Sequence, residues 1–467
     1  MRHSPWQGLR APVAAVLAFA LLAAACGDGE DDSGPQEETP AVDSGDTDET
    51  APEPTAEPDA GSQDESLEDA GSTALEDGAG AAPAPAPESD SAEQDDTPAE
   101  PAPAMADGEP IRVGNVSSLT GAGLFPEASV AAKAVFDRIN AEGGIGGRPI
   151  ELVIEDDGGT PEGAATAGRK LVEQEDVVAM VGSASVLECA VNSAFYAEQG
   201  VYSIQGTGVD PLCFLSSNIS PVNTGPFAGI TVSLYYASET LALDRVCNIN
   251  LFVIPDLAPA FDAAVARWES ITGKSLEFRV KAATLEDDPT PLMLQARDAG
   301  CQAVVIDGVE PHALAVGRAI DAQDLGDIVW IGLTSYYTDA IASQLGSAGN
   351  GLRANSEFEP YGSDAPALDD WKALMTGAGI PLTSFAQGGY LAATIFAEAL
   401  RGIDGEITRE SVADAMRNLD PYETPLLGTP YTFGPGDAHA PNQASKFVEL
   451  RDGQWVTAAD DWVILPG

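Results

Sequence analysis

The sequence predicts an α/β protein in which two doubly wound parallel-sheet lobes follow a leader and an acidic stretch. Three observations support this prediction. Strand-like apolar runs alternate with helix-like amphipathic stretches from residue 111 onward, which is typical of parallel sheets with crossover helices. The chain after residue 109 is longer than a single hydrophobic core usually serves. Residues 27–109 contain 27 Asp or Glu and no Lys or Arg, so they lack the composition of a folded domain.

Residues 1–25 are typical of an export signal. They contain two arginines, then an apolar stretch of about 15 residues, and end in three alanines before Cys26. This stretch is too short for a membrane span. The segment LAAAC that ends at Cys26 resembles the bacterial lipobox, whose cysteine becomes the lipidated N-terminus. We therefore expect a lipoprotein signal peptide, lipidation at Cys26 and anchoring to the outer face of the cytoplasmic membrane. The alternative is an ordinary signal peptide with a chance cysteine.

Residues 26–109 are expected to form a disordered tether rich in Pro, Ala and acidic residues. Their apolar area is too small to offset the cost of ordering the chain, and their like charges repel. As a flexible coil this segment spans roughly 50 Å. A second interpretation is that it binds a cationic partner or Ca²⁺.

The whole chain carries 22 Lys plus Arg against 74 Asp plus Glu, for a net charge of −52. Residues 110–467 keep 47 of these acids and 20 of the bases, so the acidic balance is not confined to the tether. Such a charge excludes nucleic-acid backbones and anionic membrane surfaces as natural partners, because both would repel the protein. The acidic surface fits salt adaptation or solubility equally well.

The expected elements fall into two successive series. In the first, strands at 111–116, 150–155, 177–181 and 201–205 alternate with helices at 127–140, 161–174 and 188–199. In the second, strands at 246–254, 276–280, 303–307 and 328–332 alternate with helices at 259–272, 289–299 and 311–322.

The sequence offers little material for catalysis. It has three histidines, one of them in the leader, and no paired-histidine metal motif or phosphate loop. The segment GSASV after the strand at 177–181 lacks the second glycine of a Gly-x-Ser-x-Gly elbow. Gly121 and Gly123 hint at a dinucleotide site, but Pro126 stands at the third glycine position. We therefore expect no enzyme activity, no cofactor and no metal.

Several segments resemble periplasmic binding proteins of the leucine/isoleucine/valine-binding type. They are IRVGNVSSLTG at 111–121, INAEGGIGGRP at 139–149, VAMVGS at 178–183, YAEQGV at 196–201, and YLAATIFAEAL at 390–400. Their order and spacing are more specific than any one of them.

The resemblance implies a type I periplasmic binding fold, with a three-strand hinge joining lobe 1 (110–225 plus 358–441) to lobe 2 (226–357 plus 442–467). It also implies a monomer that captures a small solute between the lobes and delivers it to the permease subunits of an ABC importer. An alternative is a ligand-responsive sensor or adhesin that uses the same lobes.

Candidate ligand-binding residues follow the expected strands, because ligands of open parallel sheets bind beyond the carboxyl ends of the strands. From the first lobe these are hydroxyls in two loops and two residues where the family places aromatic walls: Ser183, Ser185, Thr207, Phe125 and Phe385. From the second lobe they are Glu310, Thr334, Ser335 and Tyr336. The serines could instead cap a helix, the phenylalanines could belong to the core, and Glu310 could cap the helix that begins near Pro311.

The sequence departs from amino-acid-binding relatives at three positions. Val186 and Val209 replace their hydroxyl residues, and Thr334 falls where they carry the glutamate that binds the ammonium group. A buried ammonium without a carboxylate partner is costly by several kcal/mol. Either Glu310 substitutes, or the solute is an amide, a urea-like compound or an aromatic acid rather than a branched-chain amino acid.

Four cysteines remain after Cys26, and export favours their pairing. Three pairings are possible. We expect Cys189 with Cys213 and Cys247 with Cys301, because each pair then stays inside one lobe. The alternative is four buried free thiols.

Overall fold

The computed structural model describes residues 106–121, 125–251, 257–281, 288–436, 438–439 and 442–466. The leader, Cys26 and the tether up to residue 105 lie outside the described residues. So does the end of the strand expected at 246–254. Among the described residues, no helix is long and apolar enough to cross a membrane.

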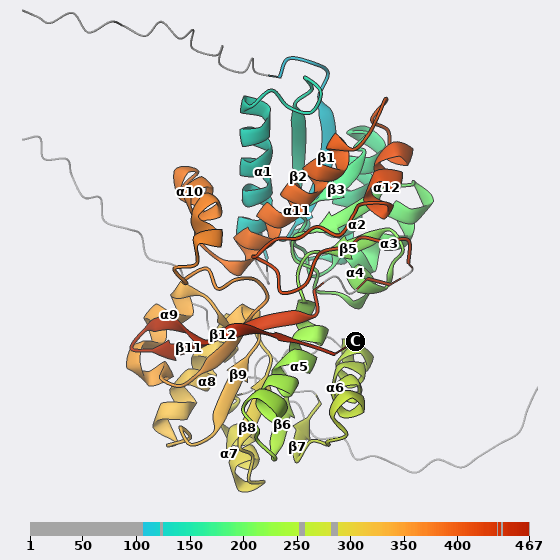
Figure 1. The fold of residues 1–467 in the computed structure, drawn as a ribbon. Helices are drawn as coiled ribbons and strands as arrows, with labels where there is room; N and C mark the ends of the chain where they lie inside the picture. The colour runs from blue at the N-terminus through green and yellow to red at the C-terminus, as the bar shows by residue number, and fades with distance from the viewer. Residues whose placement is uncertain are drawn as a thin grey trace, which may run out of the picture. The chain divides into compact units, whose positions relative to one another are not determined.

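Two sheets organise the described chain (Figure 1). The first has the strand order β2-β1-β3-β4-β5 and is parallel throughout. Its strands are β1 (Ile111–Ser117), β2 (Ile150–Asp156), β3 (Ala179–Val181), β4 (Tyr202–Gln205) and β5 (Ile219–Pro221).

The second sheet has the order β12-β11-β10-β9-β8-β6-β7. Its strands are β6 (Val246–Ile249), β7 (Phe278–Val280), β8 (Ala303–Ile306), β9 (Val329–Gly332), β10 (Arg353–Ser356), β11 (Ala444–Arg451) and β12 (Gln454–Ile464). From β7 to β10 it is parallel and repeats the order of the first sheet, whereas β11 and β12 add an antiparallel edge. The predicted doubly wound α/β fold is confirmed, and this edge is an addition that the strand-helix alternation did not predict.

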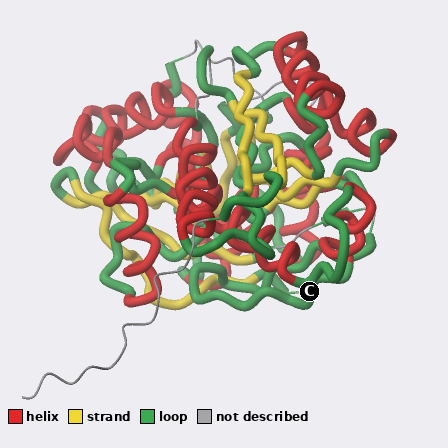
Figure 2. The backbone as a smooth tube through the Cα atoms, turned by 90° about the horizontal axis from the view of Figure 1, so that it is seen from above, coloured by secondary structure: helices red, strands yellow, loops and turns green. Residues whose placement is uncertain are grey.

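Helices flank the strands, as the view from above shows (Figure 2). Along the first half of the chain these are α1 (Pro126–Ala141), α2 (Pro161–Arg169) with a π-helical continuation (Lys170–Gln174), α3 (Glu188–Glu198), α4 (Pro211–Leu215), α5 (Gly225–Tyr235) and α6 (Ala258–Thr272). The later ones are α7 (Thr290–Asp298), α8 (Glu310–Ala322), α9 (Asp339–Leu345), α10 (Asp369–Gly377), α11 (Ser384–Arg401) and α12 (Arg409–Arg417).

The pair α1 and α11 shows how late sequence returns to the first sheet. Helix α1 buries Ala128, Ala131, Val135 and Ile139, a spacing of three and four residues that gives one apolar face. Against it lies Gly389 of α11, where a Cβ atom would stand 1.9 Å from the carbonyl oxygen of Ala128. Only glycine permits this approach of the two backbones.

The chain passes between the two sheets three times: after β5, after β10 and before β11. The passes lie close together, because Thr224 on the first donates its hydroxyl to the carbonyl of Ala444 at the end of the third, at 2.9 Å.

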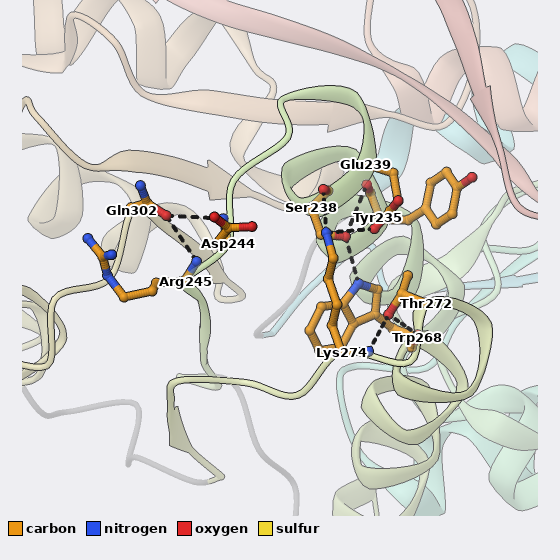
Figure 3. Close-up of polar contacts among 9 residues, drawn as sticks. All are labelled: Tyr235, Ser238, Glu239, Asp244, Arg245, Trp268, Thr272, Lys274 and Gln302. Carbon is orange, nitrogen blue, oxygen red and sulfur yellow. Dashed lines mark hydrogen bonds and ion pairs between the residues drawn. The ribbon is translucent and has the colours of Figure 1, made fainter.

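Hydrogen bonds of polar side chains connect the helices and loops around the second sheet (Figure 3). The indole Nε1 of Trp268 in α6 donates to the Ser238 hydroxyl at 3.0 Å, and Lys274 Nζ donates to the Ser238 carbonyl at 2.8 Å. Gln302 accepts the backbone N–H groups of Asp244 and Arg245, which holds the start of β6 beside the start of β8.

Both expected disulfides are present. Cys189 in α3 is bonded to Cys213 in α4, with a Cα–Cα distance of 5.2 Å. Cys247 in β6 is bonded to Cys301, just before β8, with a Cα–Cα distance of 6.0 Å. Each disulfide joins two segments that belong to the same sheet and its flanking helices.

We expect the bond between Cys247 and Cys301 to stabilise the protein more than the bond between Cys189 and Cys213, because their sequence separations are 54 and 24. Loop-closure entropy predicts losses of about 4 and about 3 kcal/mol when each pair is replaced by serine. Urea unfolding of the two double variants measures both losses. Equal stability of either variant and the parent would contradict the contribution assigned to that bond.

Candidate functional site

A pocket lies where the carboxyl-end loops of the two sheets face each other. Its volume is about 90 Å³. One water molecule needs about 10–15 Å³ when volume is measured in the same way. The pocket therefore has room for a solute of roughly six to nine non-hydrogen atoms. The described residues that line it come from both sheets: Phe125, Val186, Thr207, Gly208, Val209, Asn223, Gly225, Pro226, Phe261, Asp307, Gly308, Val309, Leu333, Thr334, Ser335, Asn355, Glu357 and Phe385.

On the first sheet's side, aromatic rings and a loop form the wall. Phe125 precedes α1 and Phe385 lies in the first turn of α11, and their ring centroids are 4.7 Å apart. Thr383 caps α11 by accepting the N–H of Ala386 at 3.1 Å, which sets where Phe385 begins the helix.

The loop after β4 reaches the same wall because α11 presents glycine to it. A Cβ atom at Gly388 would stand 2.2 Å from the Gly206 carbonyl oxygen. This close approach of the two backbones brings Thr207 beside the start of α11. The Thr207 side chain has no hydrogen-bond partner among the described residues, so its hydroxyl is available to a solute.

On the second sheet's side, the loops after β8, β9 and β10 supply the wall. Ser335 donates its hydroxyl to the Gly308 carbonyl at 2.7 Å, which ties the β9 loop to the β8 loop. Two buried polar atoms on this wall, Thr334 Oγ1 and Asn355 Oδ1, have no partner among the described residues. Both oxygens can therefore accept a hydrogen bond from a solute.

Glu357 is a deeply buried carboxylate at the base of the pocket. Its Oε1 accepts the backbone N–H of Gly225 at 2.7 Å and the side-chain amide of Asn223 at 3.2 Å. No described residue donates to its Oε2. Burial raises the pKa of Glu357 to about 7, and the two hydrogen bonds only partly oppose this effect.

Asp307 is the second carboxylate of the pocket, at the end of β8, and is 2% exposed. Its oxygens accept the backbone N–H of Leu251 and the side-chain amide of Asn250.

The structure brings five of the nine proposed ligand-binding residues to the pocket: Phe125, Thr207, Thr334, Ser335 and Phe385. The three positions that depart from amino-acid-binding relatives, Val186, Val209 and Thr334, also lie on its wall.

Ser183 and Ser185 are placed elsewhere, which corrects the expectation for both. Ser183 is fully buried; its hydroxyl accepts the N–H of Val116 and donates toward Glu188. Ser185 donates to Asp157 and accepts the N–H groups of Leu187 and Glu188, the capping role that the sequence left open.

Tyr336 and Glu310 are also absent from the pocket wall. Tyr336 is fully buried and donates its hydroxyl to the Asp307 carbonyl at 3.1 Å, so it supports the wall from behind. Glu310 is exposed in the first turn of α8 and accepts the side-chain amide of Gln344 at 3.0 Å. Its position outside the pocket wall does not favour the expectation that it replaces the ammonium-binding glutamate.

Sequence reasoning did not identify Asn355 and Glu357 as site residues. Asn355 lies near the end of β10, and Glu357 directly follows this strand. The strand sequence RANS has no apolar alternation that would predict a strand. The signal that could have identified Glu357 was its own acidic side chain, two positions before Glu359 and at the expected border between the lobes.

Another buried carboxylate, that of Glu188, lies beneath the first sheet's loops and does not line the pocket. It accepts the Tyr196 hydroxyl at 3.0 Å and the Gln205 amide at 3.0 Å. Burial raises the pKa of Glu188 to about 7, and these hydrogen bonds oppose the shift without cancelling it.

We expect Glu188 to make stability fall with rising pH. Its pKa in the folded protein lies above the value near 4.5 of an unperturbed carboxyl, so its contribution is complete below about pH 4.5 and is lost as pH rises through about 7. Glu188→Gln cannot ionise. The free energy of unfolding of this variant, relative to the parent, should therefore rise by about 3 kcal/mol between pH 4.5 and pH 8. A difference that stays constant with pH would contradict the raised pKa.

Comparisons with known proteins agree with this geometry. Both sheets have the arrangement of two-lobed proteins that bind a ligand between their lobes. Residues 110–454 match the family model described as periplasmic binding protein, and the chain belongs to this family. The predicted resemblance to the leucine/isoleucine/valine-binding type is confirmed.

Three relatives illustrate the similarity. The leucine-, isoleucine-, valine-, threonine- and alanine-binding protein of Pseudomonas aeruginosa is 24% identical over 308 residues, covering 63% of this chain and 78% of its own. The branched-chain amino acid transporter substrate-binding protein of Streptococcus pneumoniae, solved with isoleucine, is 19% identical with a TM-score of 0.62, covering 76% of this chain and 100% of its own. A solute-binding protein from R. palustris, solved with 4-hydroxybenzoate, is 17% identical with a TM-score of 0.63, covering 77% of this chain and 98% of its own.

Proteins of this family bind solutes outside the cytoplasm and are not enzymes, and the relatives include components of ABC transporters.

Proposed function

We propose that this protein is a lipid-anchored binding protein that captures a small organic solute in the pocket and delivers it to the permease subunits of an ABC importer. The observation that carries the proposal is the pocket itself, which takes residues from both sheets at the carboxyl ends of their strands. Solutes bind there in open parallel sheets, because loop side chains and backbone groups converge at that edge.

The three passes between the sheets support a hinge. Lobe 1 would comprise residues 110–225 and 358–441, and lobe 2 residues 226–357 and 442–467. A solute that touches both walls favours a closed arrangement over an open one, and a permease can distinguish the two. We propose that the protein acts as a monomer, since one chain supplies both walls.

The relatives support a small solute without naming it. One was solved with isoleucine and another with 4-hydroxybenzoate, so similar folds hold chemically different molecules. The pocket volume of about 90 Å³ limits the solute of this protein to a comparable size.

We expect at least one compound of a broad solute library to raise the melting temperature, because binding to the folded state alone stabilises it by mass action. Thr207→Ala and Phe385→Ala should weaken binding of that compound at least tenfold, since each removes a pocket contact. Phe195→Ala is the matched control, because Phe195 is also half-buried but lies in α3 outside the pocket. If both pocket variants bind as tightly as this control, the proposed site is wrong.

The anchor rests on Cys26 and its LAAAC context. We expect the exported parent to partition with membranes, and Cys26→Ser to appear in the soluble fraction or as an uncleaved precursor, because it has no thiol to lipidate. Fractionation with mass spectrometry of the N-terminus measures this. Equal membrane recovery of the two forms would exclude lipid anchoring at Cys26.

A further inference from the structure

The polar side chains of the pocket present hydrogen-bond acceptors and few donors. Glu357 and Asp307 are its two ionisable residues, and no Lys, Arg or His lines it among the described residues. The segments of 106–467 that the structure leaves undescribed contain no Lys, Arg or His in their sequence either. The described lining of the pocket therefore has acidic side chains and no basic one.

Most side-chain donors on the wall are already used. The Asn223 amide donates to Glu357 and to the Gly208 carbonyl, and the Asn355 amide donates to the Ser445 hydroxyl at 3.2 Å. The Ser335 hydroxyl is engaged with Gly308. The hydroxyls of Thr207 and Thr334 and the second N–H of the Asn355 amide remain.

Two backbone N–H groups of the loop after β4 are also occupied. The N–H of Thr207 donates to the Ser183 carbonyl at 3.1 Å, and the N–H of Gly208 donates to Asn223 Oδ1 at 2.8 Å. The positions of the hydroxyl residues of amino-acid-binding relatives are filled by Val186 and Val209. A carboxylate here would meet no basic residue and no hydroxyl at Val186 or Val209, and two acidic side chains would line its pocket.

The acceptors, by contrast, lack donors. Glu357 Oε2 and Asn355 Oδ1 have no partner among the described residues, and Asn355 is 1% exposed. An ammonium group supplies three N–H donors and the positive charge that a buried carboxylate needs. The rings of Phe125 and Phe385, with Leu333 and Val309 opposite, offer apolar contact for the rest of such a molecule.

We propose that the pocket takes a small primary amine with an apolar body and no carboxylate, whose ammonium group is held by Glu357 and Asn355. This inference rests on the proposed function and narrows its substrate class. The solute differs from an amino acid because valines stand at the two hydroxyl positions on the first sheet's side, and acidic side chains line the pocket without a basic one among the described residues.

Matched probes test the inference on the parent protein. The series is 3-methylbutan-1-amine, L-leucine, 4-methylpentanoate and 3-methylbutan-1-ol, which share a branched apolar body and differ in their charged groups. Calorimetry should give the amine at least tenfold tighter binding than each of the other three. Equal or tighter binding of L-leucine or 4-methylpentanoate, or no binding of the amine, would overturn the inference.

Glu357→Gln tests the residue that holds the charge. It keeps the shape of the side chain, and its carbonyl can still accept from Gly225 and Asn223. Binding of 3-methylbutan-1-amine should weaken at least tenfold, while binding of the alcohol stays within twofold. Glu188→Gln is the matched control, because Glu188 is equally buried, has a similarly raised pKa and does not line the pocket. Equal amine affinity of the two variants would overturn the role of Glu357.

The pH dependence gives an independent readout. An ammonium group binds only the charged form of Glu357, whose pKa without a solute is about 7, so amine affinity should rise between pH 6 and pH 8. The groups in contact with Glu357, namely Asn223, Gly225 and Asn442, do not titrate. Asp307 is the other ionisable group of the wall, and Lys446 on β11 is paired with Glu359. The rise should vanish in Glu357→Gln, and a rise that persists there would count against the inference.

These outcomes separate the inference from the proposed function. If the wider library yields a carboxylate that binds and is weakened by Phe385→Ala, the binding function stands and the amine does not. If no compound of that library binds, the proposed function falls, and the inference falls with it.

Discussion

Hydrogen bonds of Glu357 link the three passes of the chain between the sheets. The first pass supplies Asn223 and the N–H of Gly225 to its carboxylate, the second contains Glu357 itself, and the third supplies the Asn442 amide to its carbonyl at 2.7 Å. Buried polar groups are costly when they lack partners, so these hydrogen bonds favour keeping the three passes together. This constraint places the base of the pocket and the junction of the sheets at one residue. A group that binds to Glu357 therefore acts on the junction directly.

Charge and apolar surface are separated within the pocket. The phenylalanine pair lies on the first sheet's side, whereas the two carboxylates lie on the second sheet's side or at the base. A solute with one polar end is thereby oriented before the walls approach each other. The net charge of −52 adds a long-range field of the same sign, which raises the local concentration of cations near the protein at low ionic strength.

The alternation of strands and helices was sufficient to predict both parallel sheets, because their buried strands are short continuous apolar runs such as AVVI in β8. It also led to Thr207, Thr334 and Ser335, since loops after such strands meet at one edge. The alternation of strands and helices could not predict the direction of side chains. Ser183 and Ser185 lie in the loop expected at the pocket, but their side chains turn inward, toward Glu188 and Asp157. Glu357 escaped prediction because β10 has polar residues on both sides of its strand, and only its partners β9 and β11 show that it is one.

The antiparallel edge of the second sheet bears on how the protein folds after export. Strand β10 is completed by β11, which begins about 90 residues later in the chain, and β11 pairs in turn with β12 near the C-terminus. A chain that crosses a membrane from its N-terminus exposes the partner of β10 last. Contacts of such large sequence separation form slowly, so the second sheet keeps an open edge until β11 and β12 are available to pair. The first sheet also waits for α11, and the late-emerging quarter of the chain thus sets the order of assembly.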